Sequence, residues 1–222
     1  MRSAGGAAGE TRVWLAPPEA ATHFDPGRQS AADAARWATL QVPSRRLEWA
    51  ASRALLAHLA GQGLTSASLA HSGGWCAALT ASTALRAGID LERIRGRDEL
   101  ALARWAYAES EWQALAALQA AERQRRFYAL WTLKEACAKA LGLGLLVALR
   151  ECVFRVDGGR WQGRVPTRDP WQAWVFAPRS ELVLAVACTG ERARLAAIPH
   201  LLEWPHRRAV EWAPVVHVRS ED

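Results

Sequence analysis

Two acidic residues stand two positions apart in the segment GIDLER, at Asp90 and Glu92. The apolar residues Ile89 and Leu91 alternate with them, and this period of two predicts a strand with one apolar face and one acidic face. Carboxylates spaced in this way lie roughly 7 Å apart and repel each other unless a positive group lies between them. That group is either a neighbouring arginine, on a solvated strand face, or a hard divalent cation such as Mg²⁺.

The segment LWTLKEACAKALGLGL, residues 130–145, predicts an amphipathic helix that ends at a glycine-rich turn. At 100° per residue, Lys134 falls in the middle of the apolar stripe, and Glu135 and Lys139 fall on its rim. Burying an unpaired ammonium group costs several kcal/mol, so Lys134 indicates either a partner carboxylate or an ammonium that extends to a cleft. Glu135 and Lys139 also have the spacing of an ordinary i, i+4 ion pair, worth about 0.3–0.5 kcal/mol.

These two segments would form one site if Glu135 faced the same cleft as Asp90 and Glu92. Three carboxylates would then bind one metal ion, and the lysines would supply positive charge for phosphates bound to that metal. His71 and Ser72 add hydrogen-bond donors at the end of a predicted strand, directly before a Gly-Gly pair. We exclude a serine hydrolase, because the chain has no GxSxG motif and adjacent residues on a strand do not face each other.

The motifs SLAHS, GIDLE and W-x-x-K-E-A-x-x-K-A-x-G-x-G-L, in this order, resemble those of the Sfp-type 4'-phosphopantetheinyl transferases. That family has a G-[VI]-D-x-E strand and a W-x-x-K-E-x-x-x-K helix some forty residues later. Asp90 and Glu135 are 45 positions apart in this chain. The resemblance extends over about residues 44–190.

The resemblance implies a role for each matching residue. Asp90, Glu92 and Glu135 would be the ligands of Mg²⁺, with Mn²⁺ as a possible substitute. Coenzyme A would contact the basic and hydroxyl side chains of Arg53, His71, Ser72, Lys134 and Lys139. Glu111, together with Lys139, would act in catalysis, with Glu111 helping to deprotonate the acceptor serine.

The resemblance also implies a fold and an activity. Such enzymes are α+β proteins made of a pseudo-two-fold pair of similar halves, each a long helix packed on a small antiparallel sheet. They act as monomers and transfer the phosphopantetheine arm of coenzyme A to a serine of an acyl, peptidyl or aryl carrier protein, releasing 3',5'-ADP. Only seventeen residues separate Arg53 from His71, fewer than in larger members of the family. This short connection leaves a second hypothesis open, a non-catalytic relative that binds coenzyme A or a carrier protein.

The chain has 222 residues and a formal net charge of +6, which favours partners with negative charge. A basic nucleic-acid-binding domain is a third hypothesis, but no nucleic-acid docking motif is present, so we expect no nucleic-acid partner. The twelve tryptophans have no common spacing, and packing explains them better than base stacking.

The four cysteines form no CxxC pair and lie in apolar runs, which predicts reduced, buried thiols. Neither an apolar leader nor a stretch suited to a bilayer is evident, so we expect a cytoplasmic protein without a membrane partner.

The hydrophobic pattern predicts a strand near residue 11, helices at 31–40, 44–61, about 97–118 and 119–141, and a hairpin around Gly73-Gly74. Further strands are predicted in LRAGIDLERI, ECVFRVDGG, WQAWVFAP and ELVLAVACT. We divide the chain into an N-terminal half (1–86), a C-terminal half with the metal motifs (87–190) and an extension (191–222) whose elements the pattern does not assign.

Overall fold

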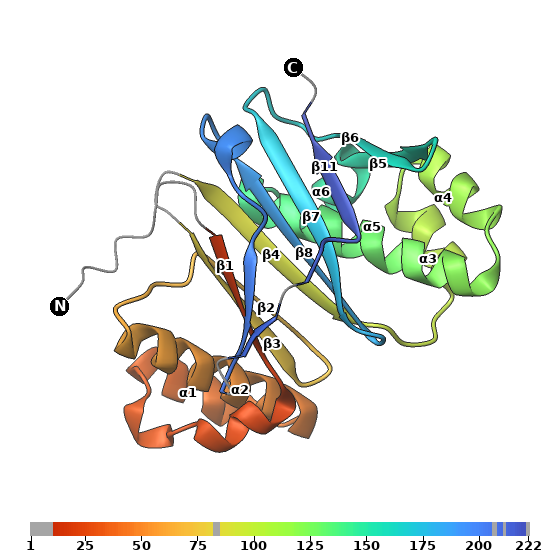
Figure 1. Ribbon diagram of the computed structural model, residues 1–222. Coiled ribbons are helices and arrows are strands. Elements are labelled where there is room, and N and C mark those ends of the chain that lie inside the picture. The colour runs from red at the N-terminus through yellow and green to blue at the C-terminus, as the bar shows by residue number, and fades with distance from the viewer. Residues whose placement is uncertain (1–10, 82–84, 206–207, 211, 221–222) are drawn as a thin grey trace.

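The fold has four layers in the order helix, sheet, sheet and helix (Figure 1). The computed structural model describes residues 11–81, 85–205, 208–210 and 212–220. The helices are α1 (Ala31–Thr39), α2 (Pro43–Gly61), α3 (Glu99–Ala106), α4 (Glu109–Ala116), α5 (Ala120–Leu141) and α6 (Leu145–Glu151), with short 3-10 helices η1 (Pro18–His23), η2 (Pro26–Arg28) and η3 (Ala193–Leu195). The strands are β1 (Thr11–Ala16), β2 (Ser68–Ser72), β3 (Trp75–Ala81), β4 (Arg86–Arg93), β5 (Val153–Asp157), β6 (Arg160–Arg164), β7 (Trp171–Arg179), β8 (Leu182–Thr189), β9 (His200–Glu203), β10 (Arg208–Val210) and β11 (Val216–Arg219).

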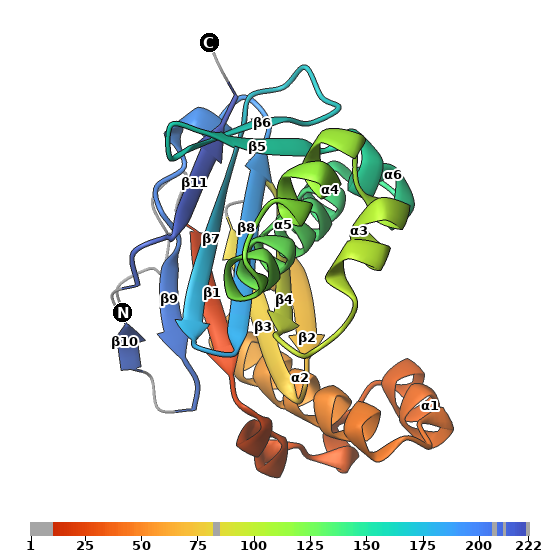
Figure 2. The ribbon, with the colours of Figure 1, turned by 90° about the vertical axis from the view of Figure 1, so that its right-hand side faces the viewer.

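The first sheet has the strand order β10-β9-β1-β3-β2, and the second has the order β11-β7-β8-β4. Among the described strands of these two sheets, β1 and β9 pair in parallel and the other pairs are antiparallel. Helix α2 packs on the outer face of the first sheet, and α5 packs on the outer face of the second (Figure 2). The predicted α+β class, with a long helix on a small sheet in each half, is confirmed.

Alternation along the strands explains why the two sheets pack together. Leu15 and Leu79 of the first sheet, and Ile89 and Trp174 of the second, are fully buried in one shared cluster between the sheets. The opposite faces of the same strands carry many small apolar residues, such as Ala78 and Ala185, beside which α2 and α5 pack closely. Both halves therefore depend on one common core.

The sheets also meet at their edges, where β2 lies beside β4. The hydroxyl oxygens of Ser68 and Ser72 accept hydrogen bonds from the backbone N–H groups of Ile89 and Arg93, each at 3.1 Å. Serine side chains thus satisfy edge donors of β4 that no strand pairs with. This contact sets the hairpin of β2 and β3 next to the acidic strand.

The predicted hairpin at Gly73-Gly74 is confirmed, and both glycines adopt the positive φ angles, 59° and 88°, that such a turn requires. The helix predicted at 97–118 is instead two helices, α3 and α4, because the chain bends at Tyr107 and a Glu111 carboxylate oxygen accepts from the N–H of Ala108 at 3.1 Å. Helix α6 and strand β6 were absent from the sequence prediction.

The segment 191–222 adds strands to both sheets. Strand β9 pairs with β1 in the first sheet, and β11 pairs with β7 in the second.

All four cysteines are free and buried, as predicted. Within the described residues, none of the helices has both the length and the apolar character needed to cross a bilayer.

Candidate metal centre

Strand β4 presents its acidic face to α5. Ile89 and Leu91 are buried between the sheets, so Asp90 and Glu92 point to the opposite side, as the alternation predicted. Gly88 lies on the same face of β4, two residues before Asp90, and allows the backbone of α5 to approach the strand very closely. A Cβ atom at Gly88 would lie only 2.2 Å from the carbonyl oxygen of Ala136. Glycine at this position is therefore a condition for the contact between β4 and α5.

That close contact brings three carboxylates together. One oxygen each from Asp90, Glu92 and Glu135 lies within 4.8 Å of the other two. Asp90 is only 5% exposed, and its Oδ2 atom is buried without a hydrogen-bond partner among the described residues. A buried carboxylate oxygen without a donor is costly, and a cation would satisfy it.

Lys139 lies one turn after Glu135 and contacts the same cluster. Its Nζ atom donates to Asp90 Oδ1 at 2.9 Å and to the carbonyl oxygen of Ile89 at 2.7 Å. The lysine side chain is 33% exposed, so its ammonium group borders solvent. Within the described part of the chain no ion pair joins Glu135 to Lys139. Lys139 pairs with Asp90 instead of forming the i, i+4 ion pair that its spacing from Glu135 allowed.

The electrostatics of the cluster favour an additional positive charge. Burial, opposed by the nearby Lys139 and assisted by Glu135 and Glu92, raises the pKa of Asp90 from 3.8 to about 8. Burial also raises the pKa of Glu92, against the hydrogen bond from Ser72. Lys139, Arg97 and Arg95 supply positive charge nearby, yet the pKa values of both carboxyl groups stay raised, so a further cation would stabilise the cluster.

Ser72 and His71, at the tip of the hairpin, occupy different positions relative to the cluster. The Ser72 hydroxyl donates to Glu92 Oε2 at 2.9 Å, so Ser72 orients one of the three carboxylates. His71 points the other way, with Nδ1 3.3 Å from Glu48 Oε2 and with 42% of its side chain exposed.

Glu48 of α2 is a residue that the sequence reasoning missed. It is only 7% exposed, and its carboxylate contacts His71, Arg45 Nη1 at 3.3 Å and the N–H of Gly74 at 3.4 Å. Its one sequence signal is an acidic residue on the helix face that also holds Ala51 and Leu55, where an unpaired carboxylate would be unfavourable. Glu48 ties the hairpin tip to α2 and orients the His71 ring.

Arg53 lies further along α2 and faces a different cavity. Its Nε atom is 3.3 Å from Asp33 Oδ1 of α1, and its guanidinium stacks 3.9 Å over the Trp49 ring. The cavity of about 260 Å³ that it lines also includes Arg28 and Asp25. None of the three carboxylates lines this cavity, so Arg53 does not face the acidic cluster.

Lys134 and Glu111 do not fit the roles that the family resemblance implied. Lys134 is fully buried, and its Nζ atom donates to Glu111 Oε2 at 2.7 Å and to the carbonyl oxygens of Leu149 and Cys152 at 2.7 and 2.6 Å. These three bonds use all its protons. Of the two alternatives that the sequence left open for Lys134, a partner carboxylate or a cleft, the structure contains the partner carboxylate, which is Glu111.

Glu111 is equally occupied. It is 3% exposed, and besides Lys134 it accepts from the N–H groups of Ala108 and Phe154, the latter at 2.9 Å. The pair joins α4, α5, the end of α6 and the start of β5. Neither Lys134 nor Glu111 is accessible to a substrate, so we withdraw both from the coenzyme A and catalytic roles.

Comparisons with known proteins agree with the position of this cluster. A model of the 4'-phosphopantetheinyl transferase superfamily matches residues 86–202, which include β4 and α5. The 4'-phosphopantetheinyl transferase HetI of Nostoc sp. is 32% identical over 104 residues, which cover 46% of this chain and 43% of HetI. The 4'-phosphopantetheinyl transferase psf-1 of Bacillus pumilus is 31% identical over 102 residues, which cover 46% of this chain and 42% of psf-1.

These matches span less than half the length of the curated relatives. A solved structure, the holo-[acyl-carrier-protein] synthase of Thermotoga maritima, aligns with a TM-score of 0.37 and 19% identity, over 48% of this chain and 63% of that one. The family match covers more than half of the chain and contains the three carboxylates, and the chain belongs to the 4'-phosphopantetheinyl transferase superfamily.

Proposed function

We propose that the protein transfers the 4'-phosphopantetheine arm of coenzyme A to a serine of an apo acyl, peptidyl or aryl carrier protein and releases 3',5'-ADP. The observation that carries this proposal is the convergence of Asp90, Glu92 and Glu135 within 4.8 Å, in a chain of this superfamily. The two curated relatives are named as 4'-phosphopantetheinyl transferases, which supports the same reaction.

The three carboxylates fit a hard divalent cation, with Mg²⁺ first and Mn²⁺ second. All three donors are oxygens, as Mg²⁺ prefers, and the buried Oδ2 of Asp90 lacks a donor among the described residues. When bound, such an ion would neutralise charge on the pyrophosphate of coenzyme A. Asp90, Glu92 and Glu135 would hold it.

The remaining side chains of the site orient substrate and supply positive charge. Lys139, one-third exposed beside Asp90, would contact a phosphate of coenzyme A. His71, whose ring is oriented by Glu48, and Ser72 would border the phosphate-binding region, whereas Arg53 pairs with Asp33 in a separate cavity and is not assigned to this region. Phosphoryl transfer depends mainly on positioning and charge neutralisation, which these residues supply without a covalent intermediate on the protein.

The acting unit in this proposal is a cytoplasmic monomer. All three carboxylates come from one chain, so the site needs no second copy. The four free cysteines suit a reducing compartment.

Mass spectrometry tests the proposal directly. The protein is incubated with coenzyme A, Mg²⁺ and each of several apo carrier proteins, and we expect the carrier to gain the mass of phosphopantetheine. Asp90→Asn and Glu135→Gln should abolish the gain, whereas Glu109→Gln, at an exposed carboxylate of α4, should not. Absence of the mass gain across the carrier panel would contradict the proposal, and coenzyme A binding without 3',5'-ADP release would support the non-catalytic relative.

A further inference from the structure

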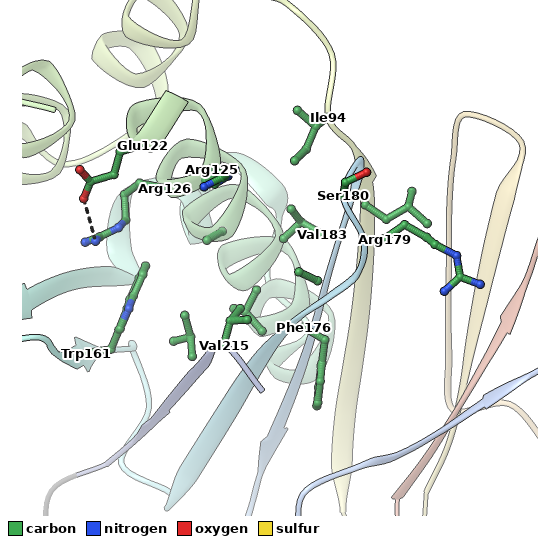
Figure 3. A pocket seen from close by; sticks show the side chains of 15 residues that line it. Ile94, Glu122, Arg125, Arg126, Trp161, Phe176, Arg179, Ser180, Val183 and Val215 are labelled. Carbon is green, nitrogen blue, oxygen red and sulfur yellow. Dashed lines mark ion pairs between the residues drawn. The ribbon is translucent and has the colours of Figure 1, made fainter. Parts of the chain in front are cut away.

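The connection between β4 and α3, residues 94–98, directly follows the acidic strand and has no regular secondary structure. Its backbone is nevertheless fixed where it leaves the strand. The N–H of Arg93 donates to the Ser72 hydroxyl at 3.1 Å. The N–H of Ile94 donates at 2.7 Å to the carbonyl oxygen of Glu181, in the turn between β7 and β8. Figure 3 shows the Ile94 side chain beside this turn, so two separate elements hold the start of the connection.

Tyr128 of α5 provides a third support. Its side chain is fully buried, and its hydroxyl group accepts from the N–H of Arg95 at 3.1 Å and donates to the carbonyl oxygen of the same residue at 3.0 Å. The tyrosine ring also contacts a cation, because the Cζ atom of Arg97 lies 5.1 Å from the ring centroid. One side chain of the central helix thus fixes the backbone of Arg95 and stacks with the side chain of Arg97.

Both arginines act on the Glu92 end of the acidic cluster. Burial raises the pKa of Glu92, and Arg97 and Arg95 are among the groups that oppose this rise, which places both positive charges near the carboxylate. Among the described residues, neither guanidinium group forms a hydrogen bond or an ion pair with another side chain. Arginines that are held in place with their donors unused are available to an anionic ligand.

This pair of arginines lies on the opposite side of the cluster from Lys139. Lys139 contacts Asp90 and follows Glu135 by four residues on α5. Tyr128 precedes Glu135 by seven residues, or about 10 Å along the helix axis. On β4, the chain likewise runs from Asp90 to Glu92 and then toward the arginines. The three carboxylates therefore lie between a lysine and two arginines.

We propose that Arg97 binds the pyrophosphate of coenzyme A from the Glu92 side of the metal centre, and that Tyr128 is a positioning residue that holds Arg97 there. The inference rests on the proposed function, because that reaction brings the pyrophosphate to the three carboxylates. A guanidinium group binds phosphate oxygens through two parallel hydrogen bonds, which supply direction as well as charge. Because the connection is ordered before the substrate arrives, less loss of conformational freedom opposes binding.

An acidic side chain of the carrier protein is the competing partner for these arginines. Arg95 is exposed, whereas Arg97 is half-buried between the Tyr128 ring and the Glu92 carboxylate. A small anion bound at the carboxylates reaches this half-buried position more readily than a protein surface does. We therefore assign Arg97, and not Arg95, to the pyrophosphate.

Isothermal titration calorimetry with coenzyme A and Mg²⁺ tests the role of the arginine. We expect Arg97→Gln to raise the Kd at least tenfold. Arg97→Lys should raise it less, because lysine keeps the charge but loses the paired hydrogen bonds. Arg104→Gln is the matched control, because Arg104 also stacks on an aromatic ring at 5.1 Å, that of Trp112, and its replacement changes the net charge equally. The control should stay within twofold of wild type.

Dephospho-coenzyme A, which lacks the 3'-phosphate, identifies the group that Arg97 contacts. An equal rise in Kd for both ligands would support the pyrophosphate. A rise for coenzyme A alone would place Arg97 at the 3'-phosphate and overturn the assignment.

Tyr128→Phe tests the positioning role, because it removes the hydroxyl group and keeps the ring. We expect a Kd for coenzyme A about threefold above wild type. The double variant with Arg97→Gln should bind no more weakly than Arg97→Gln alone, since the hydroxyl acts through the arginine. Tyr107→Phe is the control, because it removes another buried hydroxyl that donates to a backbone carbonyl at 3.1 Å, and its affinity should equal that of wild type. Additive losses in the double variant would contradict the positioning role.

Transfer assays and urea unfolding separate the remaining outcomes. The KM for the carrier should stay within twofold of wild type in Arg97→Gln, and a rise in that KM alone would assign the arginine to the carrier. Lower stability with unchanged coenzyme A affinity would limit Arg97 to covering the Tyr128 ring and overturn the inference, as would a wild-type protein that does not bind coenzyme A. Coenzyme A binding that Arg97→Gln loses, in a protein that transfers the arm to no carrier, would support the inference and contradict the proposed reaction.

Discussion

Substitution of Gly88 by alanine should separate the two halves of the candidate metal centre. The added Cβ would lie 2.2 Å from the carbonyl oxygen of Ala136, 2.6 Å from the backbone nitrogen of Ala140 and 2.8 Å from Lys139 Cβ. An ordinary contact begins at 3.4 Å, so the deficit to the carbonyl oxygen is 3.4 − 2.2 = 1.2 Å. Two of the three atoms belong to the helix backbone, so rotation of a side chain cannot relieve the clash.

Helix α5 must therefore move away from β4 by about 1 Å, and it carries Glu135 and Lys139 with it. Overpacking of this kind costs about 1–3 kcal/mol, and with three contacts under 3.0 Å we expect the upper end, about 3 kcal/mol. A shift of about 1 Å in a catalytic geometry lowers kcat/KM by about 100-fold. Loss of activity should thus accompany a partial loss of stability.

Urea unfolding followed by circular dichroism, Mg²⁺ titration calorimetry and the carrier-loading assay measure the three effects. Gly61→Ala is the matched control, because a Cβ there meets nothing within 4 Å and the residue ends α2 far from β4 in sequence. Its free energy of unfolding should change by less than about 1 kcal/mol, with wild-type activity. A destabilised Gly88→Ala protein with unchanged Mg²⁺ affinity would refute the argument that this glycine sets the distance between the carboxylates.

Three further predictions concern the charged groups around the site. Lys134→Met should leave the buried Glu111 carboxylate unpaired and lower the free energy of unfolding by about 3–5 kcal/mol, and urea unfolding should show partial recovery in the double variant with Glu111→Leu. A raised KM for coenzyme A with normal stability would instead return Lys134 to the substrate site. Because the pKa of Asp90 is raised from 3.8 to about 8, the folded protein holds a proton that the unfolded chain releases, so this contribution to stability is complete below pH 3.8 and is lost as the pH rises to about 8. In metal-free urea titrations from pH 4 to 8.5, the stability of wild type relative to Asp90→Asn should fall, and a flat difference would contradict the pKa. Glu48→Gln should weaken the support of His71 and raise the KM for coenzyme A several-fold with little change in kcat, and equal losses in kcat would place the effect in the chemical step.

The sequence predicted the parts of the fold that local patterns determine. The period of two in GIDLER placed Ile89 and Leu91 in the core and the carboxylates on the other face, and the structure has this arrangement. The Gly73-Gly74 hairpin follows from the backbone conformation that two glycines permit. Both signals lie within a few residues, so no tertiary information was needed.

Contacts between distant segments were the parts that the sequence did not reveal. Strand β9 is four residues long and pairs in parallel with β1, almost the whole chain away. A strand so short carries too few residues for a period-two pattern to be recognised. The burial of Glu48 under the hairpin tip likewise depends on how α2 packs on the first sheet.

The two lysines of the helix motif show where sequence reasoning about a site reaches its limit. Lys134 and Lys139 lie five residues apart on α5, and each could be read as a cation for phosphates. Their positions around the helix differ, because Lys134 falls in the apolar stripe and Lys139 on its rim. An ammonium group in the apolar stripe needs either a partner carboxylate or access to a cleft. The choice between those alternatives depended on Glu111, 23 residues away, whose position follows from the bend at Tyr107 that separates α3 from α4. Because that bend sets Glu111 inside the core, the ammonium of Lys134 is used to hold helices together, and the positive charge available to a substrate on this helix face comes from Lys139.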